Sequence, residues 1–275
     1  MSTALAVRHG VFGRAALYKL NRHFLTHAHR EAHLTFHVRG RPACITVSGE
    51  PVALDPGTGV AINPWQPHSY DPGDCDDWTV VLVLYIRPQW TADEGLPGRS
   101  GLRFGRTPLA VTAAVQAHVD RIVTLLAGDD ASNRFEPHLR DLAWVCHEQS
   151  WHTAAAAVDW DRQQLYRDYR IRNSIRLMRD RIGDECAIDL IARDAGLSRP
   201  HFYKLFRQHV GVTPNIYLNT LRMESAIERL TVTLDPVTSI GLDLGFASQA
   251  SFTRFFATNV GVPPSDYRRA ACSLH

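Results

Sequence analysis

Two stretches in the C-terminal half follow the same pattern: residues 188–206 read IDLIARDAGLSRPHFYKLF, and residues 237–256 read VTSIGLDLGFASQASFTRFF. They align at an offset of 49 residues up to a shared glycine and at an offset of 50 residues beyond it. Apolar, tiny and aromatic residues recur in register, which indicates a duplicated structural unit. The matched pairs are Ile188/Val237, Ile191/Ile240, Ala192/Gly241, Gly196/Gly245, Ser198/Ser248, Phe202/Phe252, Phe206/Phe256, Gly211/Gly261, Pro214/Pro264 and Tyr217/Tyr267.

Each copy has the pattern of a helix-turn-helix. A tiny residue in the first helix lets the second approach closely, a glycine supplies the turn, and a serine caps the second helix. That second helix has phenylalanines on one face. Its other face carries Arg, Lys and Gln, which can reach base edges in a major groove. The candidate residues are Arg199, Tyr203, Lys204 and Arg207 in the first copy, and Gln249, Ser251 and Arg254 in the second.

The charge distribution favours DNA binding over a plain helical bundle with a solvated polar face. The net charge is only +2. Residues 1–164 have 15 Lys/Arg against 17 Asp/Glu, whereas residues 165–275 have 15 against 11. A single copy would support DNA binding and a plain helical bundle equally, but two copies in the basic part of the chain indicate a nucleic-acid partner.

A helix between the copies is predicted from Thr213-Pro214, a cap followed by a proline at the first helical position. From Asn215 to about Leu230 it would be about 24 Å long. Such a rod could hold two recognition helices about one DNA turn, or roughly 34 Å, apart.

Residues 165–275 resemble the DNA-binding domain of the AraC/XylS family of bacterial transcription regulators. The resemblance rests on residues 245–256, GFASQASFTRFF, on GVPP at 261–264, and on RMESA at 222–226. It implies base contacts from Pro200, Tyr203 and Lys204 in the first recognition helix, and from Gln249, Ala250, Ser251 and Arg254 in the second. Ala257 departs from the family, which often has a basic residue there, and implies one phosphate contact fewer.

The N-terminal part reads as β structure up to about Trp90. Short β-branched or aromatic stretches at 34–38, 45–47, 60–62 and 79–86 alternate with Gly- and Pro-containing turns, which is typical of a sandwich or small barrel. Two helices should follow, one opened by Thr107-Pro108 and one around 136–157. We therefore expect an α+β chain with two domains, 1–160 and 165–275, joined by a polar segment at 159–168.

Histidines concentrate in this β region. His27-Ala-His29, then His33, then Gly40 after six residues resembles the first cupin motif, and residues 56–68, PGTGVAINPWQPH, resemble the second. His27, His29 and His33 share odd parity, so on one strand they would face the same side, where His68 could join them. Neutral imidazoles suit Zn, Fe, Ni or Cu, so these four are candidate metal ligands. They could equally be hydrogen-bonded pocket residues without a metal. The candidate effector pocket comprises His27, His29, His33, Phe36, Trp65 and His68, although Trp65 could simply pack at the barrel mouth.

Composition excludes several classes of protein. No apolar run approaches the roughly 20 residues of a membrane span, and no secretory signal pattern opens the chain. The five cysteines are far apart and include no C-x-x-C, which argues against a disulfide framework or a cysteine-built zinc module and fits the cytoplasm. It also argues against a DNA-repair alkyl acceptor, which needs a zinc-bound cysteine cluster.

The sequence favours a cytoplasmic transcription regulator that responds to a small-molecule effector in the cupin domain. Its expected partners are double-stranded DNA, RNA polymerase and a second copy of the chain. The family resemblance implies that the two middle helices pair the copies, although they could equally pack only on their own barrel. No catalysis and no required cofactor are expected. The alternative is a metal-dependent cupin enzyme with an appended DNA-binding module.

Overall fold

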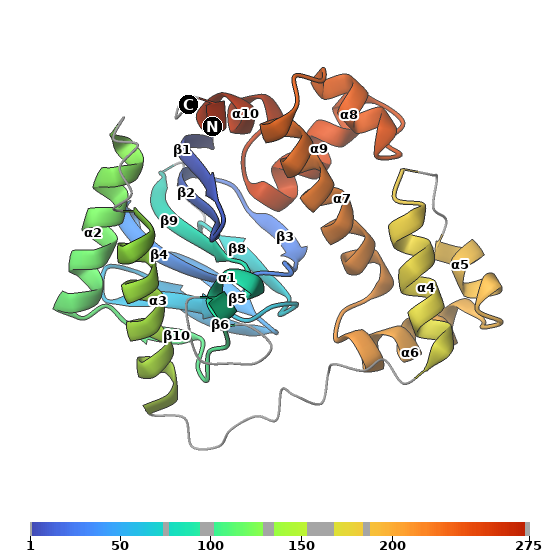
Figure 1. Cartoon of the computed structure of the whole chain (residues 1–275), viewed down its shortest axis with the longest axis horizontal. Coiled ribbons are helices and arrows are strands. Elements are labelled where there is room, and N and C mark those ends of the chain that lie inside the picture. The colour runs from blue at the N-terminus through green and yellow to red at the C-terminus, as the bar shows by residue number, and fades with distance from the viewer. Residues whose placement is uncertain are drawn as a thin grey trace.

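The computed structural model describes residues 2–73, 77–93, 102–128, 135–152, 168–183 and 188–272. Strands form the N-terminal part and helices the C-terminal part, and the two lie against each other (Figure 1). This arrangement confirms the predicted α+β class. The predicted junction at 159–168 lies outside the described residues, apart from Asp168, which caps the first C-terminal helix.

The N-terminal strands form two antiparallel sheets that share a core and are together called the barrel below. One contains, in spatial order, β1 (Thr3–Gly10), β2 (Gly13–Leu20), β9 (Thr79–Ile86), β4 (Ala32–Gly40), β7 (Thr58–Ile62) and β10 (Pro108–Ala110). The other contains β3 (Phe24–His27), β8 (His68–Asp71), β5 (Ala43–Val47) and β6 (Glu50–Leu54).

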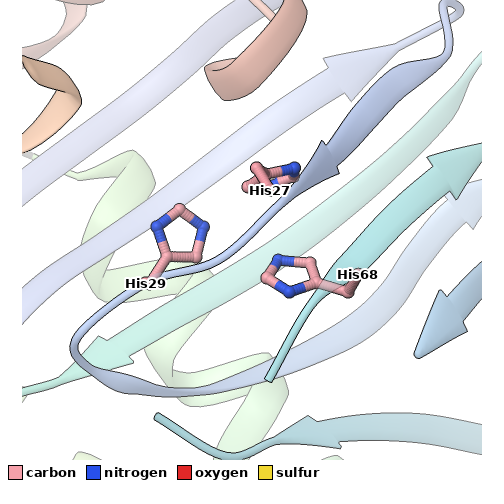
Figure 2. Close-up of side chains that lie close together, drawn as sticks. All are labelled: His27, His29 and His68. Atoms are coloured by element: carbon pink, nitrogen blue, oxygen red, sulfur yellow. The ribbon is translucent and has the colours of Figure 1, made fainter. Parts of the chain in front are cut away.

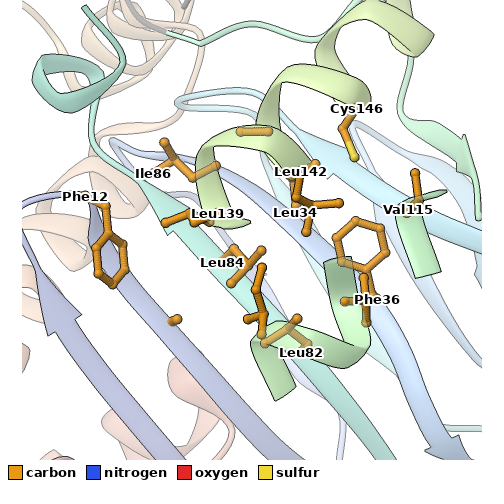
Figure 3. Packing of buried hydrophobic residues seen from close by; sticks show 14 of the residues in the cluster. Phe12, Leu34, Phe36, Leu82, Leu84, Ile86, Val115, Leu139, Leu142 and Cys146 are labelled. Atoms are coloured by element: carbon orange, nitrogen blue, oxygen red, sulfur yellow. The ribbon is translucent and has the colours of Figure 1, made fainter. Parts of the chain in front are cut away.

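Helices cover the outer face of the first sheet. The short α1 (Pro88–Asp93) follows β9, and α2 (Ala113–Ala127) and α3 (Phe135–His152) pack on the sheet (Figure 3). Leu34 and Phe36 of β4 contact this helical layer, as do Leu82 and Leu84 of β9. Since neighbouring residues of a strand face opposite sides, the intervening residues of β4 point into the space between the sheets.

The first middle helix was predicted to start in the wrong place. Pro108 opens the edge strand β10, where it pairs with Val60 of β7, and the helix begins only after Thr112. The hydroxyl of Thr112 accepts a hydrogen bond from the Val115 amide at 3.4 Å. A proline is tolerated at the first residue of an edge strand as well as at a helix start, so the local pattern was ambiguous. The second middle helix is confirmed from residue 136 to His152, and its predicted end at 153–157 lies outside the described residues.

The C-terminal helices are α4 (Tyr169–Asp180), α5 (Ile188–Asp194), α6 (Arg199–Val210), α7 (Pro214–Val232), α8 (Val237–Asp243), α9 (Gln249–Val260) and α10 (Pro264–Cys272). The two copies of the repeat form α5–α6 and α8–α9, with α7 between them (Figure 1). With 19 residues, α7 is about 28 Å long. Among the described residues, no helix combines the length and apolar character needed to cross a membrane.

Candidate DNA-binding surface and histidine site

The turns of both helix-turn-helix units adopt the backbone conformation that their glycines predict. Gly196 has φ of 67° and Gly245 has φ of 82°, in the left-handed region. A Cβ atom on Gly241 would lie 2.8 Å from Cβ of Phe252, so α8 and α9 approach too closely for a larger residue. Ser248 caps α9 through a reciprocal pair of hydrogen bonds with Ser251. Ser198 occupies the corresponding cap position of α6, but its side chain makes no capping hydrogen bond.

The candidate residues of α6 lie mainly on an exposed face. Lys204 and Arg207 are exposed, as is Pro200, and Tyr203 is half-buried. Arg199 is exposed but forms an ion pair of 3.1 Å with Asp189 of α5. Within the described chain neither Lys204 nor Arg207 has an ion-pair partner, so these two cations are available to a phosphate or a base.

The second recognition helix has fewer uncommitted polar groups. The Ser251 hydroxyl is engaged in the cap of α9, and the Gln249 side-chain oxygen accepts a hydrogen bond of 2.6 Å from the Thr238 hydroxyl. Ala250 is exposed but offers only a methyl group. Arg254 is exposed and forms no ion pair with any described residue, so it is the best placed side chain of α9 for reading a base.

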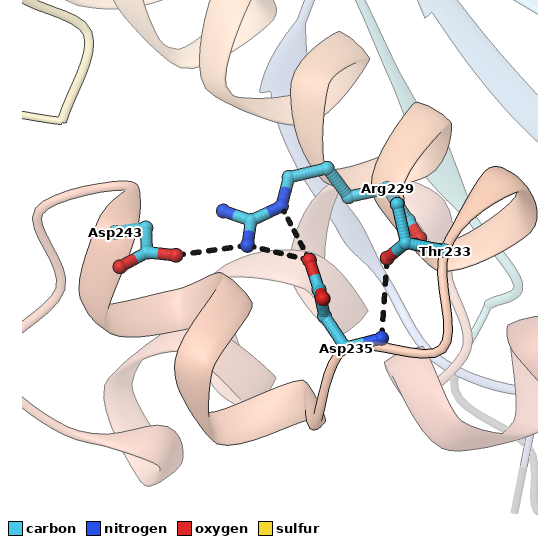
Figure 4. Close-up of polar contacts among 4 residues, drawn as sticks. All are labelled: Arg229, Thr233, Asp235 and Asp243. Atoms are coloured by element: carbon cyan, nitrogen blue, oxygen red, sulfur yellow. Dashed lines mark hydrogen bonds and ion pairs between the residues drawn. The ribbon is translucent and has the colours of Figure 1, made fainter.

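Arginines of α7 fix the positions of the two units. Arg229 donates to Asp235 and to Asp243 of α8, each at 2.8 Å, and the Asp235 amide donates to the Thr233 hydroxyl (Figure 4). Arg222 donates to the Ile182 carbonyl beyond α4 at 3.2 Å and lies 5.5 Å from the ring of Phe246 in the second unit. These arginines tie α7 to the second unit and to the end of α4, and Leu218 and Leu221 of α7 share a core with the phenylalanines of α6 in the first unit.

Three of the four candidate metal ligands converge. His27 ends β3, His29 lies in the loop that follows, and His68 begins β8 opposite His27 (Figure 2). One ring nitrogen from each of the three lies within 4.8 Å of the others. The prediction that His27, His29 and His33 lie on one strand is wrong, because β3 ends at His27 and His29 lies in the loop that follows. His33 lies on β4, its ring centroid 4.6 Å from that of His68, but outside this group of three.

Burial keeps these imidazoles neutral. His27, His29, His33 and His68 are each less than one tenth exposed. Burial lowers the pKa of His27 to about 4 and that of His33 to about 3, and it lowers the pKa values of His29 and His68 well below their usual range. At neutral pH each ring therefore has one nitrogen lone pair to offer to a ligand.

The remaining pocket candidates lie elsewhere. Phe36 points to the opposite face of the sheet, into the core under α2 and α3, because it has the other parity from His33 on β4. Trp65 stacks on Tyr217 of α7, with ring centroids 4.8 Å apart and planes at 12°. Trp65 thus packs between the barrel and the helical domain.

A buried polar cluster that the sequence did not indicate joins the two domains beside the histidines. The Arg14 guanidinium lies 3.7 Å from the centre of the Tyr85 ring and 3.4 Å from the hydroxyl of Tyr267 on α10. The Tyr267 hydroxyl is also 3.0 Å from Nε2 of His9. Tyr267 is the repeat equivalent of Tyr217, so the helices that follow the two units, α10 and α7, dock on the barrel through the same repeat position.

Helix α7 also contacts the histidine loop directly. The Thr220 hydroxyl shares its hydrogen between the Ala28 carbonyl and the Ile216 carbonyl of α7, each at 2.9 Å, and Arg30 forms an ion pair of 3.1 Å with Glu224. Burial raises the pKa of Glu224 to about 7 in spite of this ion pair. A small hollow between β3 and α7 is lined by His27 and His29 on one side and by Thr220 and Met223 on the other. Its volume of about 10 Å³ admits little more than one water molecule, so a larger ligand would have to move the two domains apart.

Two family models match the chain. The helix-turn-helix domain matches residues 191–270, and the AraC-like ligand binding domain matches residues 9–145. The chain is 32% identical over 98 residues to the regulatory protein SoxS of Escherichia coli, covering 36% of this chain and 92% of SoxS. It is 30% identical over 104 residues to the regulator MtrA of Neisseria gonorrhoeae, covering 38% of this chain and 35% of MtrA. The chain thus spans only about a third of the length of such longer relatives.

Among solved structures, the whole chain has the fold of ToxT from Vibrio cholerae. The apo form of ToxT aligns with a TM-score of 0.59 at 17% identity, over 96% of this chain and 99% of ToxT. ToxT with a bound unsaturated fatty acid aligns with a TM-score of 0.57 at 16% identity, over 92% and 94% of the two chains.

Proposed function

Because the chain belongs to the AraC family of transcription regulators, we propose that it binds promoter DNA sequence-specifically through α6 and α9 and that a ligand in the N-terminal domain regulates this binding. One observation carries the proposal. Two helix-turn-helix units are anchored on the single helix α7, and both recognition helices keep exposed cations, Lys204 and Arg207 on one and Arg254 on the other. Such an arrangement supports binding to two successive major grooves.

Regulation would act through the contact between the domains. A ligand beside the histidines would touch the loop 28–31, which α7 holds through Thr220 and Glu224. A ligand that binds one arrangement of the domains more tightly shifts the population towards it and so changes DNA affinity. ToxT with its bound fatty acid supports a small-molecule ligand for a protein of this fold.

The assembly we propose is a homodimer in the cytoplasm that contacts RNA polymerase at promoters. Trp144, which is 40% exposed on α3, supports a contact between copies through the middle helices. No catalytic step is needed for this function.

The alternative function is a metal-dependent enzyme with an appended DNA-binding module, and the three converging imidazoles favour it. A substrate would have to reach an open coordination position. The hollow beside His27 and His29 is bordered by α7, so the helical domain would have to move for a substrate to enter. An effector would need the same movement to enter, but a regulator uses a change at this domain contact, whereas an enzyme gains nothing from it.

Selection of genomic DNA fragments by the purified full-length chain at moderate salt tests the proposal. We expect one enriched motif with two boxes about one helical turn apart. Arg254→Ala should relax the preference at one position of one box, whereas Arg176→Ala, which removes an exposed arginine of α4, should keep it. Retention of DNA without enrichment, and only at low salt, would contradict the proposed function because it indicates contacts to phosphate alone.

A further inference from the structure

We propose that His27, His29 and His68 bind one divalent transition-metal ion through their Nε2 atoms, and that this ion fastens the barrel to α7. The metal site stands on the geometry of the three imidazoles. The role in regulation rests on the proposed function above.

Two of the rings are already oriented as metal ligands. Nδ1 of His27 lies 2.7 Å from the Leu25 carbonyl oxygen, and Nδ1 of His68 lies 2.8 Å from the Gln66 carbonyl oxygen. A carbonyl can only accept, so each Nδ1 must carry the hydrogen, and each neutral ring presents its lone pair on Nε2. A hydrogen bond from the second nitrogen to a backbone carbonyl is how ligating histidines are commonly held.

The third ring lacks a partner where the metal would lie. Nε2 of His29 is buried and makes no hydrogen bond with any described residue. The ligating atoms of the three rings lie within 4.8 Å of one another. Tetrahedral coordination at about 2.0–2.1 Å brings ligand nitrogens to about 3.3 Å apart, so small side-chain rotations are enough. Imidazole donors select zinc, cobalt, nickel or copper over magnesium or calcium. His33 is the nearest further imidazole to this group.

The same short segment holds both the metal ligands and the anchors of α7. Between His27 and His29, the Ala28 carbonyl accepts the hydrogen bond from Thr220. The His29 carbonyl accepts from the Trp65 amide at 2.7 Å, and Trp65 stacks on Tyr217. The next residue, Arg30, pairs with Glu224. The three anchors on α7, at 217, 220 and 224, lie on one face of that helix.

Metal binding and docking of α7 are therefore linked. An ion that draws His27 and His29 towards His68 orders the backbone at 27–30, which is the surface that α7 grips. Linkage is reciprocal, so loosening α7 must weaken the binding of the metal. A substitution on α7 that touches no imidazole should thus lower metal affinity.

Titration of untagged, metal-stripped, full-length chain with Co²⁺, followed by its ligand-field absorption and by competition with Zn²⁺, tests the site. We expect one ion per chain. His68→Asn and His29→Asn should each lower the affinity by more than about tenfold. The matched control is His23→Asn, because His23 is an exposed histidine just before the same strand. If His68→Asn unfolds the chain, His29→Asn still tests the metal site. Nε2 of His29 makes no hydrogen bond that this substitution would remove, so a loss of Co²⁺ binding would come from the lost ligand and not from unfolding.

A second pair of variants tests the linkage. Thr220→Val removes the hydroxyl that holds Ala28 and should lower Co²⁺ affinity by about fivefold or more. Thr231→Val is the control, since the Thr231 hydroxyl bonds only to carbonyls within α7. Hydrogen exchange of α7 amides should slow when Co²⁺ is added to the wild type, and less so in Thr220→Val.

The possible outcomes separate the two proposals. A folded chain that selects its DNA motif but binds no stoichiometric ion would overturn the metal site and leave the proposed function intact. A chain that binds one ion but selects no motif would support the metal site and overturn the proposed function. Equal Co²⁺ affinity in Thr220→Val and the wild type would overturn the linkage.

Discussion

Replacing Glu224 by glutamine should remove a pH-dependent loss of stability at the contact between the domains. The Glu224 carboxylate pairs with Arg30 at 3.1 Å, but its side chain is only 27% exposed. Burial, helped by the nearby negative charge of Glu31, outweighs the cations Arg30 and Arg14 and raises the pKa of the carboxyl from 4.5 to about 7. Glutamine has the shape of the protonated acid and cannot ionise.

The direction of this pH dependence follows from the protons that the folded and unfolded chains bind. Between about pH 4.5 and pH 7 the folded chain keeps the proton on Glu224 while the unfolded chain releases it, so stability falls as the pH rises through this window. At about 1.36 kcal/mol per unit, the wild type should lose on the order of 3 kcal/mol relative to Glu224→Gln between pH 4.5 and pH 8. Any constant difference between glutamine and the protonated acid cancels in this comparison.

Urea unfolding of both chains at a series of pH values measures the difference. Glu228→Gln is the matched control, because Glu228 is an exposed glutamate one turn further along α7. We expect the stability of Glu224→Gln over the wild type to grow as the pH rises. A constant difference, or one that grows in favour of the wild type, would refute the reasoning, because it would mean that the pair with Arg30 outweighs the burial of the carboxylate.

Three further substitutions test other parts of the structure. Arg254→Ala should cost about 1–3 kcal/mol of discrimination at one operator position, measured on base-substituted operators, and an unchanged preference would remove Arg254 from the reading surface. Phe252→Ala should cost about 3–5 kcal/mol of stability, because the ring is fully buried between Phe246 and Phe256. A loss in urea unfolding below about 1 kcal/mol would show that the second unit does not depend on this core. Trp65→Ala should lower the unfolding midpoint, since the stack on Tyr217 contributes about 0.5–1.5 kcal/mol beyond the area that it buries. An unchanged midpoint would mean that this stack does not hold the domains together.

The features that could be predicted from the sequence are local ones. Strand β9 has the predicted bounds, 79–86, because its run of β-branched and apolar residues is buried on both faces. The repeat was predictable because turn glycines, helix caps and apolar spacing each leave a mark within a few residues. The helix start predicted at Thr107-Pro108 was wrong because the same dipeptide fits both a helix start and the beginning of an edge strand.

Contacts between distant parts of the chain could not be predicted, because no local sequence pattern indicates them. Arg14 and Tyr267 are 253 positions apart, and neither stands in a pattern that points to the other. Thr220 reads as one polar residue in a helix, and nothing near it indicates that its hydroxyl holds Ala28. The histidines were found by their spacing, but their convergence depends on a loop after β3 rather than on strand alternation.

The central claim is that α7 holds two recognition helices at a fixed separation, and binding to operators with altered spacing between the two boxes tests it most directly. With α7 as a rigid rod, inserting a half turn (about 5 base pairs) or a full turn (about 10 base pairs) should reduce affinity to that of a single box. Recovery of full affinity with the full-turn insertion would contradict the claim, because the two boxes would then be bound by separate, flexibly joined units.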